Sequence, residues 1–311
     1  MSTGGETYRA YTNAQGDSYA AGRPGYAPAL FTSIIDHHMD TGGQLDTVVD
    51  VGCGTGQATL DLCPYFAKAI GLDPSEGMIK SARASAKSAS SSAQFDVSAG
   101  EDIGSDLKPP IADGSIDLLT AATAAHWFDM ARFWASAART VKAGGTVALW
   151  ARTAMTIDPE KTPNGTAIRA VVDEVDRELM PFDRRGSILT RDLYVDLPLP
   201  WTLDTPVEGF DKASLVRREW NKAREYYEAD QKEDLGLGAT VTAEQFASLV
   251  NTNSSVIRWR EAHPEKAGTE EDLVASMKSQ IERLLAEAGE DPGARVLKGG
   301  VAMVLLMIKK L

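Results

Sequence analysis

Three glycines stand at alternating positions in the run Gly-Cys-Gly-Thr-Gly, residues 52–56. The β-branched residues of 48–51 come directly before them and predict a short buried strand that stops at Gly52. A helix over 57–66 is expected after the turn. Glycine permits positive φ and close approach of another molecule to the backbone, and a helix N-terminus attracts polar and anionic groups. Strand, glycine turn and helix in this order predict a nucleotide-type binding site.

Two carboxylates belong to the same pattern. Asp50 lies inside the strand before the first glycine, and Asp73 ends a second short strand over 69–73. The acid after the second strand of such a βαβ unit accepts hydrogen bonds from ribose hydroxyls, which makes Asp73 the candidate for that contact. A dinucleotide pyrophosphate needs the spacing G-x-G-x-x-G. The turn at 52–56 lacks that third position, so the spacing disfavours a nicotinamide or flavin cofactor.

The runs Asp50-Val-Gly-Cys-Gly-Thr-Gly56 and Gly71-Leu-Asp-Pro-Ser75 resemble the first two motifs of class I S-adenosylmethionine (SAM) methyltransferases. The resemblance implies SAM as the cofactor and methyl transfer of the EC 2.1.1 type as the reaction. It also implies cofactor contacts from residues in and after both motifs, namely Asp50, Gly52, Cys53, Gly54, Gly56, Gln57, Asp73, Pro74 and Met78.

The segment ahead of the glycine turn extends this resemblance. Tyr19, Arg23-Pro24 and Tyr26 look like the N-terminal segment of the trans-aconitate methyltransferase type, which folds over the cofactor. The resemblance implies cofactor contacts from Tyr19 and Arg23, and Tyr11 is a candidate for the substrate side. A surface turn with ordinary aromatic packing is the alternative for this segment.

A third strand is expected over 94–97, ending at the run Ser-Ala-Gly-Glu-Asp of residues 98–102. In the methyltransferases that the chain resembles, this exit holds the adenine, so Gly100, Glu101 and Asp102 are cofactor candidates. Glycine permits close approach, and an acidic side chain can meet the adenine amino group. The run lacks the acid-alanine pair common in the wider class, and an acidic loop that is merely solvated is the alternative.

A fourth strand over 115–120 is followed by Ala121 and then by His126 and Trp127. Ligands bind at the carboxyl ends of parallel strands, which puts His126 near the expected reaction centre. A His-Trp-Phe run here is also familiar in the trans-aconitate type. His126 is the catalytic candidate: it accepts a proton from a substrate hydroxyl, orients a carboxylate, or covers the adenine pocket with Trp127. Ala121, His126 and Trp127 are assigned to the cofactor, and Trp127 and Trp150 to the methyl acceptor.

Strands and helices alternate up to a fifth strand over 146–150. The alternation predicts an α/β fold with a doubly wound, mostly parallel sheet, and the resemblance implies seven strands in a Rossmann-like methyltransferase fold. The apolar run 301–308 is expected to form an antiparallel last strand. The expected organisation is an N-terminal segment closing over the site (1–46), a SAM-binding core (47–151), a mainly helical substrate lid with late core elements (152–298) and the last core strand (299–311).

The expected lid contains a helix over 168–179 and another that starts at Thr269-Glu-Glu-Asp272, which has capping-box spacing. The runs Leu197-Pro-Leu-Pro-Trp201 and Trp259-Arg-Glu-Ala-His-Pro264 also look like landmarks of the same family. A guanidinium pairs bidentately with carboxylate, so arginines here are candidate clamps for an anionic substrate, with solvated surface charge as the alternative. The candidates are Arg184, Arg185, Arg191, Arg258 and Arg260.

The charge balance bears on the kind of partner. Thirty-two Lys and Arg against 44 Asp and Glu give a formal net charge of −12, which repels phosphate backbones and favours a small-molecule acceptor over nucleic acid. No secretory signal and no apolar run of about 18 residues is visible, so no membrane partner is expected. Cys53 and Cys63 are poorly placed to bridge, which favours a reduced, cytoplasmic chain. The histidines lack ligand spacing, so no metal is expected, and monomer and homodimer both stay open.

The sequence therefore predicts a SAM-dependent methyltransferase that acts on an oxygen of a small molecule, either a carboxylate or a hydroxyl. A carboxylate is already ionised at neutral pH and needs no base, whereas a hydroxyl gives His126 the role of proton acceptor. A protein of the same fold that binds SAM without methylating, as a regulator or rearrangement catalyst, would keep the same glycines and Asp73. A nicotinamide oxidoreductase would bind NAD but not S-adenosylhomocysteine (SAH), and the glycine spacing argues against it.

Overall fold

The computed structural model describes residues 25–226, 235–289 and 295–311. The chain forms two compact units, which are treated one at a time below. The first unit contains the chain up to residue 151 together with 194–218 and 304–311, and the second contains 152–193 and 219–303. All the described residues expected to bind the cofactor belong to the first unit.

A seven-stranded sheet with the order β3-β2-β1-β4-β5-β10-β7 forms the framework of the first unit. Strands β1 to β5 pair in parallel, and the order reverses at β1, which has β2 on one side and β4 on the other. The predicted doubly wound, mostly parallel sheet is thus confirmed. The strands are β1 (Thr47–Val51), β2 (Lys68–Asp73), β3 (Gln94–Val97), β4 (Ile116–Ala122), β5 (Val141–Arg152), β7 (Val216–Trp220) and β10 (Met303–Lys309).

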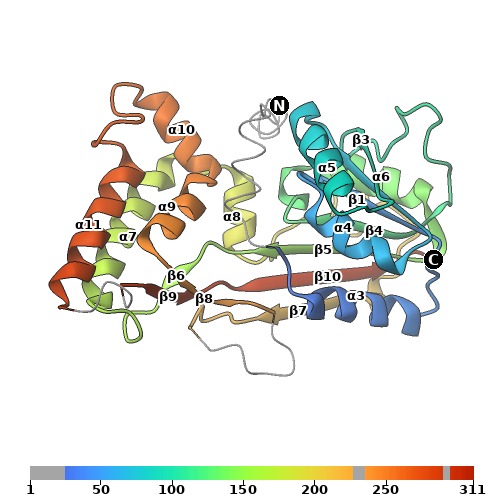
Figure 1. Cartoon of the computed structure of the whole chain (residues 1–311). Coiled ribbons are helices and arrows are strands. Elements are labelled where there is room, and N and C mark those ends of the chain that lie inside the picture. Colours follow the sequence, from blue (N-terminus) through green and yellow to red (C-terminus); the bar gives the residue numbers. More distant parts are fainter. Residues whose placement is uncertain (1–24, 227–234, 290–294) are drawn as a thin grey trace. The chain divides into compact units, whose positions relative to one another are not determined.

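The last strand, β10, lies between β5 and β7 (Figure 1). The amide of Lys310 donates to Gly145 at one end, and at the other end the amide of Thr153 donates to Ala302. Residue numbers rise along one strand as they fall along the other, so β10 runs antiparallel to β5. The predicted antiparallel last strand over 301–308 is confirmed, with a shift of two residues at its start.

Three helices of the first unit, α4, α5 and α6, begin where the sequence supplies a glycine or a capping side chain, and α3 begins with a proline in its first turn. Ser75 and Asp129 accept backbone N–H bonds at the starts of α5 and α6. The predicted helix over 57–66 ends early, because Pro64 lacks an N–H and the chain tightens into a 3-10 turn. The elements are α3 (Pro28–Asp40), α4 (Gln57–Leu62), η1 (Cys63–Tyr65), α5 (Glu76–Ser88), η2 (Ala125–Trp127), α6 (Met130–Thr140) and η4 (Lys212–Ser214).

A buried polar chain links α3, β5 and β10. Lys309 Nζ donates to Thr146 Oγ1 (3.1 Å), which lies 2.8 Å from Nδ1 of His38, and His38 Nε2 lies 2.8 Å from the Gln44 carbonyl. A carbonyl only accepts, so Nε2 carries the proton and the Thr146 hydroxyl donates to Nδ1. Burial lowers the pKa of both Lys309 and His38. A buried cation is therefore held by a neutral hydroxyl.

The second unit combines helices with a small sheet of order β6-β9-β8. Its apolar core gathers one face each of α7 and α11, including Ile168, Val172, Met277 and Ile281. The elements are β6 (Thr156–Ile157), α7 (Gly165–Leu179), η3 (Met180–Phe182), α8 (Arg185–Arg191), β8 (Gly238–Val241), α9 (Ala243–Asn251), α10 (Ser254–Ala262), α11 (Leu273–Glu287) and β9 (Leu297–Gly300).

The start of α11 corrects one prediction. The sequence predicts a capping box that opens at Thr269, but the helix begins at Leu273 and its N-cap is Asp272, which accepts from Val274 and Ala275. The Asp272 carboxylate is also bonded by two nitrogens of Arg260, at 2.6 and 2.9 Å. This ion pair holds the carboxylate at the helix start, which moves the cap three residues along the chain.

Candidate functional site

The glycine turn leaves β1 and enters α4 through three residues with positive φ: +66° at Gly52, +56° at Gly54 and +87° at Gly56. A Cβ at Gly52 would lie 2.6 Å from Ala124, and one at Gly56 would lie 2.8 Å from Phe95. Among the described residues, nothing lies within 4 Å of the position that a Cβ at Gly54 would take. The turn is therefore packed against the protein at two glycines and open at the middle one, as a backbone that faces a ligand requires.

Asp50 is fully buried beneath this turn. Its two carboxylate oxygens accept hydrogen bonds from Thr59 in α4 and Thr120 in β4, both at 2.8 Å. Burial raises the pKa of Asp50 to about 6, although the two hydroxyl bonds oppose the shift. Both oxygens are thus occupied by the protein, and the observed geometry ties the strand, helix and neighbouring strand together beside the turn.

Asp73 ends β2 next to the open glycine. Its Oδ2 accepts from the Gly54 amide at 3.0 Å and its Oδ1 from the Ser75 amide at 2.9 Å. Burial raises the pKa of Asp73 to about 6, and the two amide bonds lower it only partly. Each oxygen accepts one amide bond and retains a second lone pair. The carboxylate is therefore anchored by the turn itself and still able to accept ligand hydroxyls.

The other predicted residues of these two motifs surround the same turn. Cys53 is buried, its amide donates to the Leu72 carbonyl at 3.0 Å, and burial raises the pKa of its thiol. Gln57 is the half-buried first residue of α4, and Met78 is buried in the first turn of α5. Pro74 is half-buried between Asp73 and the α5 cap. The fold thus brings both motifs together.

Glu101, which follows β3, is more buried than the sequence indicates. Glu101 is buried, and its Oε1 accepts from the Asp129 amide at 3.0 Å, while Asp102 pairs with Arg132 at 2.9 Å. A Cβ at Gly100 would lie 2.7 Å from the ring of Phe128. Glu101 therefore links this exit to the start of α6, and the half-buried Asp102 is the more open of the two acids.

The exits from β4 and β5 carry an aromatic group. Trp150 is fully buried, with the ring of Tyr26 edge-on at 5.6 Å, and the Tyr26 hydroxyl lies 2.9 Å from Thr123 Oγ1. In the part of the chain that the structure describes, the indole N–H of Trp150 has no acceptor. Ala121 is buried in β4. A buried N–H donor without a protein partner suits a polar ligand atom at this exit.

His126 lies in η2, half-buried, with its ring 4.8 Å from the ring of Trp127. Its Nδ1 is 2.8 Å from the hydroxyl of Tyr194, whose side chain is 1% exposed. Burial raises the pKa of Tyr194, so the phenol stays protonated. Tyr194 was not predicted from the sequence, because 68 residues separate it from His126 and it belongs to none of the motifs.

Tyr11, Tyr19 and Arg23 lie outside the described residues, so their predicted contacts with cofactor or substrate stay predictions. Groups of three or more potential ligands for a metal ion do not occur within 25–226, 235–289 and 295–311. Over the same ranges, every helix is too short or too polar to traverse a bilayer.

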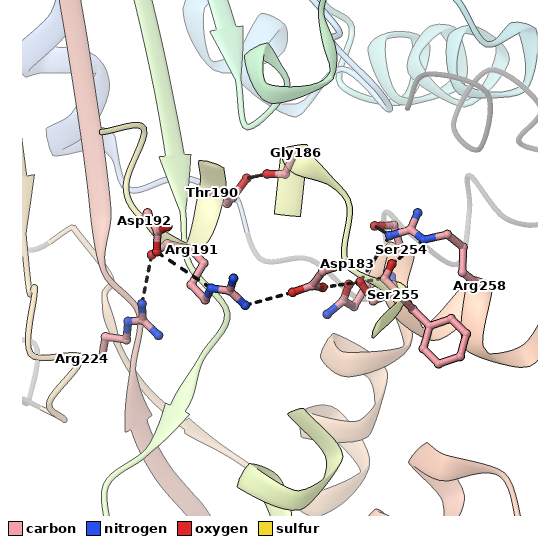
Figure 2. Close-up of polar contacts among 11 residues, drawn as sticks. Asp183, Gly186, Thr190, Arg191, Asp192, Arg224, Ser254, Ser255 and Arg258 are labelled. Carbon is pink, nitrogen blue, oxygen red and sulfur yellow. Dashed lines mark hydrogen bonds and ion pairs between the residues drawn. The ribbon is translucent and has the colours of Figure 1, made fainter. Parts of the chain in front are cut away.

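The arginines proposed as substrate clamps divide into engaged and exposed residues. Figure 2 shows Asp183 between Arg191 and Ser255, with 2.9 Å from Arg191 to Asp183 and 2.7 Å from Ser255 to Asp183. Arg258 donates to the Phe182 carbonyl at 2.8 Å. Arg260 is engaged by Asp272, as described above. Arg184 and Arg185 are exposed at the start of α8.

Comparison with known proteins agrees with this geometry. Residues 49–149 match the family described as the methyltransferase domain. A candidate methyltransferase from Dictyostelium discoideum is 38% identical over 133 residues, which make up 43% of this chain and 45% of that protein. The probable S-adenosylmethionine-dependent methyltransferase CRG1 of Saccharomyces cerevisiae is 33% identical over 130 residues, 41% of this chain and 42% of its own length. Residues 49–149 are therefore a class I, SAM-dependent methyltransferase domain.

The fold of nearly the whole chain has a counterpart among solved structures. A candidate type II methyltransferase from Anaeromyxobacter dehalogenans superposes with a TM-score of 0.58 at 24% identity, over 93% of this chain and 97% of that chain. This likeness shows a shared fold. The chain spans less than half the length of the curated relatives that it matches.

Proposed function

We propose that the whole chain is a SAM-dependent methyltransferase that transfers a methyl group to an oxygen of a small molecule. The observation that carries this proposal is the contact between the Gly54 amide and the Asp73 carboxylate, beside the open side of the glycine turn. A carboxylate held there accepts hydrogen bonds from a nucleoside diol, which is the part of SAM that the turn would receive.

Several residues at the strand exits would hold the cofactor. Asp73 would bind the ribose, Met78 would pack beside the adenine, and Asp102 would meet its amino group. Residues 52–57 would lie along the rest of the molecule. Bound SAM supplies a methyl group on a sulfonium, and its transfer to an oxygen lone pair breaks the carbon–sulfur bond and leaves SAH. The protein contributes alignment and exclusion of water, which account for much of the acceleration in such displacements.

The methyl acceptor is proposed to meet His126, Trp127 and Trp150. The buried indole N–H of Trp150 and the imidazole of His126 are hydrogen-bonding groups next to aromatic surface, a combination typical of sites for small organic molecules. An acceptor carboxylate needs only orientation, whereas a hydroxyl must also lose its proton. The sequence likeness to the trans-aconitate type supports an acceptor with a carboxylate, and the net charge of −12 disfavours nucleic acid.

The regions before and after the methyltransferase domain are proposed to enclose and select the methyl acceptor. Residues 1–46 would close over the site, and residues 152–298 would form a lid that selects the acceptor, as in the trans-aconitate type. The second unit offers exposed arginines at the start of α8, Arg184 and Arg185, that remain available for an anionic group. A cytoplasmic location fits a chain with two unbridged cysteines.

Calorimetric titration with SAM and SAH, for the wild type and for Asp73→Ala, tests the cofactor. Binding by the wild type that is lost in the variant is the expected result. Folded wild type that binds neither compound would overturn the proposal. Incubation with SAM and a panel of small carboxylic acids, phenols and amines then tests the reaction through SAH release. SAM binding without SAH release from any acceptor would favour a SAM-binding protein that does not methylate.

A further inference from the structure

Tyr194 is held in an unusual backbone conformation. Leu193 and Tyr194 both have positive φ, +54° and +57°, a region that bulky side chains rarely occupy. Such residues persist only where the surroundings determine them, and they cluster at functional sites. Tyr194 belongs to the first unit, and its hydroxyl reaches His126 in the same unit.

The segment after Tyr194 is anchored on several sides. The Tyr194 carbonyl accepts from the Leu197 amide at 3.3 Å and from Arg217 at 3.4 Å. Four residues after Tyr194, the Pro198 carbonyl accepts from the indole of Trp134 at 2.9 Å. These bonds fix the backbone from Tyr194 to Pro198, so the Tyr194 hydroxyl has little freedom to leave His126.

The direction of the hydrogen bond between Tyr194 and His126 follows from the surroundings. The backbone N–H of His126 also interacts with the Tyr194 oxygen, which uses one of its lone pairs. The phenol is buried and protonated, so its O–H needs an acceptor, and within the described residues Nδ1 of His126 is the one in reach. A neutral imidazole that accepts at Nδ1 carries its proton on Nε2.

We propose that Tyr194 is a positioning residue that donates its hydroxyl to Nδ1 of His126 and so holds the imidazole in the tautomer with the proton on Nε2. In this tautomer His126 is a hydrogen-bond donor toward the methyl acceptor and not a base. The acceptor must then bring its own ionised oxygen. The donor role of His126 toward a methyl acceptor rests on the proposed function. The tautomer of His126 is a property of the free protein and does not depend on that function.

Nitrogen NMR of histidine-labelled protein tests the tautomer directly. The chain has four histidines, and His126→Gln identifies the signal. At neutral pH we expect the wild type to show Nδ1 without a proton and Nε2 with one. Tyr194→Phe should give a mixture of the two tautomers. Tyr26→Phe is the matched control, since it removes a hydroxyl bonded to Thr123 and should leave the His126 signal unchanged. A proton on Nδ1 in the wild type would overturn the proposal.

Kinetics test the consequence once an acceptor is known. Tyr194→Phe should lower kcat about tenfold, the size expected for one lost hydrogen bond, while SAH affinity changes less than about twofold. Adding Tyr194→Phe to His126→Gln should cause no further loss, because both changes remove the same interaction. An equal loss in both backgrounds would show that Tyr194 acts independently of His126. If the protein fails to bind SAH at all, the proposed function fails while the NMR result still decides the tautomer.

Discussion

The two carboxylates at the glycine turn of the first unit and the carboxylate at the start of α11 in the second unit accept from different kinds of donor. In the first unit, Asp50 accepts from threonine hydroxyls and Asp73 from backbone amides, and burial raises the pKa of each to about 6. In the second, burial would also raise the pKa of Asp272, but bonds from Arg260 and from backbone amides lower it to about 2. Carboxylates held by neutral donors keep an uncompensated charge, which is costly for folding and useful for binding. The Asp272 carboxylate, which is paired with Arg260 and caps α11, has a structural role.

The largest effect is expected in the second unit. Arg260→Met leaves the Asp272 carboxylate, 2% exposed, without its cation, and loss of one partner of a buried pair costs about 3–5 kcal/mol. Urea unfolding should show this drop in the free energy of unfolding. Arg283→Met is the control, since Arg283 is 68% exposed and lies 3.7 Å from Glu287. It should cost less than about 0.5 kcal/mol. Equal costs would show that the burial of Asp272 does not make its ion pair with Arg260 more important for stability than an exposed pair.

The charge of Asp73 should matter for binding. Asp73→Asn removes the charged acceptor, and hydrogen bonds to a charged group are worth about 1.5–3 kcal/mol, so SAH affinity should fall about 10–150-fold. In the wild type, affinity should also fall as the pH drops below about 6, where Asp73 takes up a proton. Calorimetry between pH 5 and 8 checks both statements. Asp96→Asn, at an acid in β3 whose side chain is 48% exposed, is the control and should bind SAH normally.

Asp50 should make the wild type more stable in mild acid. Its pKa is about 6 in the folded chain and 3.8 as the reference value, so the folded state binds the proton more tightly. This contribution is fully present below about pH 4 and is lost as the pH rises through 6. Asp50→Asn should therefore flatten the free energy of unfolding between pH 4 and 7, by on the order of 2 kcal/mol. Urea titrations at several pH values measure it. An unchanged pH dependence would contradict the raised pKa.

The smallest effect on the free energy of unfolding is expected for Lys309, a buried cation that is hydrogen-bonded to a neutral hydroxyl. Lys309 is 9% exposed and donates to Thr146, so Lys309→Met removes a desolvated charge without leaving a carboxylate behind. The free energy of unfolding should change by less than about 1 kcal/mol, in contrast to Arg260→Met. Urea unfolding of the two variants side by side makes the comparison. A loss above about 2 kcal/mol would show that this cation has an ionic role.

The sequence was most informative where the chemistry is local. The glycine turn and Asp73 lie within about 25 residues of each other, and each follows a spacing rule for a strand, a turn and a helix. The fold class followed from the same alternation. The three strands of the small sheet were not predicted, since they have two to four residues each and come from distant parts of the chain.

The contacts of single side chains were harder to predict. Tyr194 meets His126 across 68 residues, and no spacing rule connects them. The arginines looked alike in the sequence, but Arg260 and Arg191 turned out to have carboxylate partners within the second unit, while Arg184 is exposed. Whether a guanidinium is free depends on which acids the fold brings to it. The roles assigned to the site residues stay predictions that the binding experiments address.

The position of β10 has a consequence for the order of folding. Strands β1 to β5 are complete at residue 152, but the partner of β5 begins at residue 303, about 150 residues later. At about 5–20 residues per second, the ribosome needs roughly 8–30 s to add them. During that interval the edge of β5 has no strand to pair with, and an open edge is a template for pairing with other chains. The growing chain is thus most exposed to aggregation after its cofactor motifs have already been made.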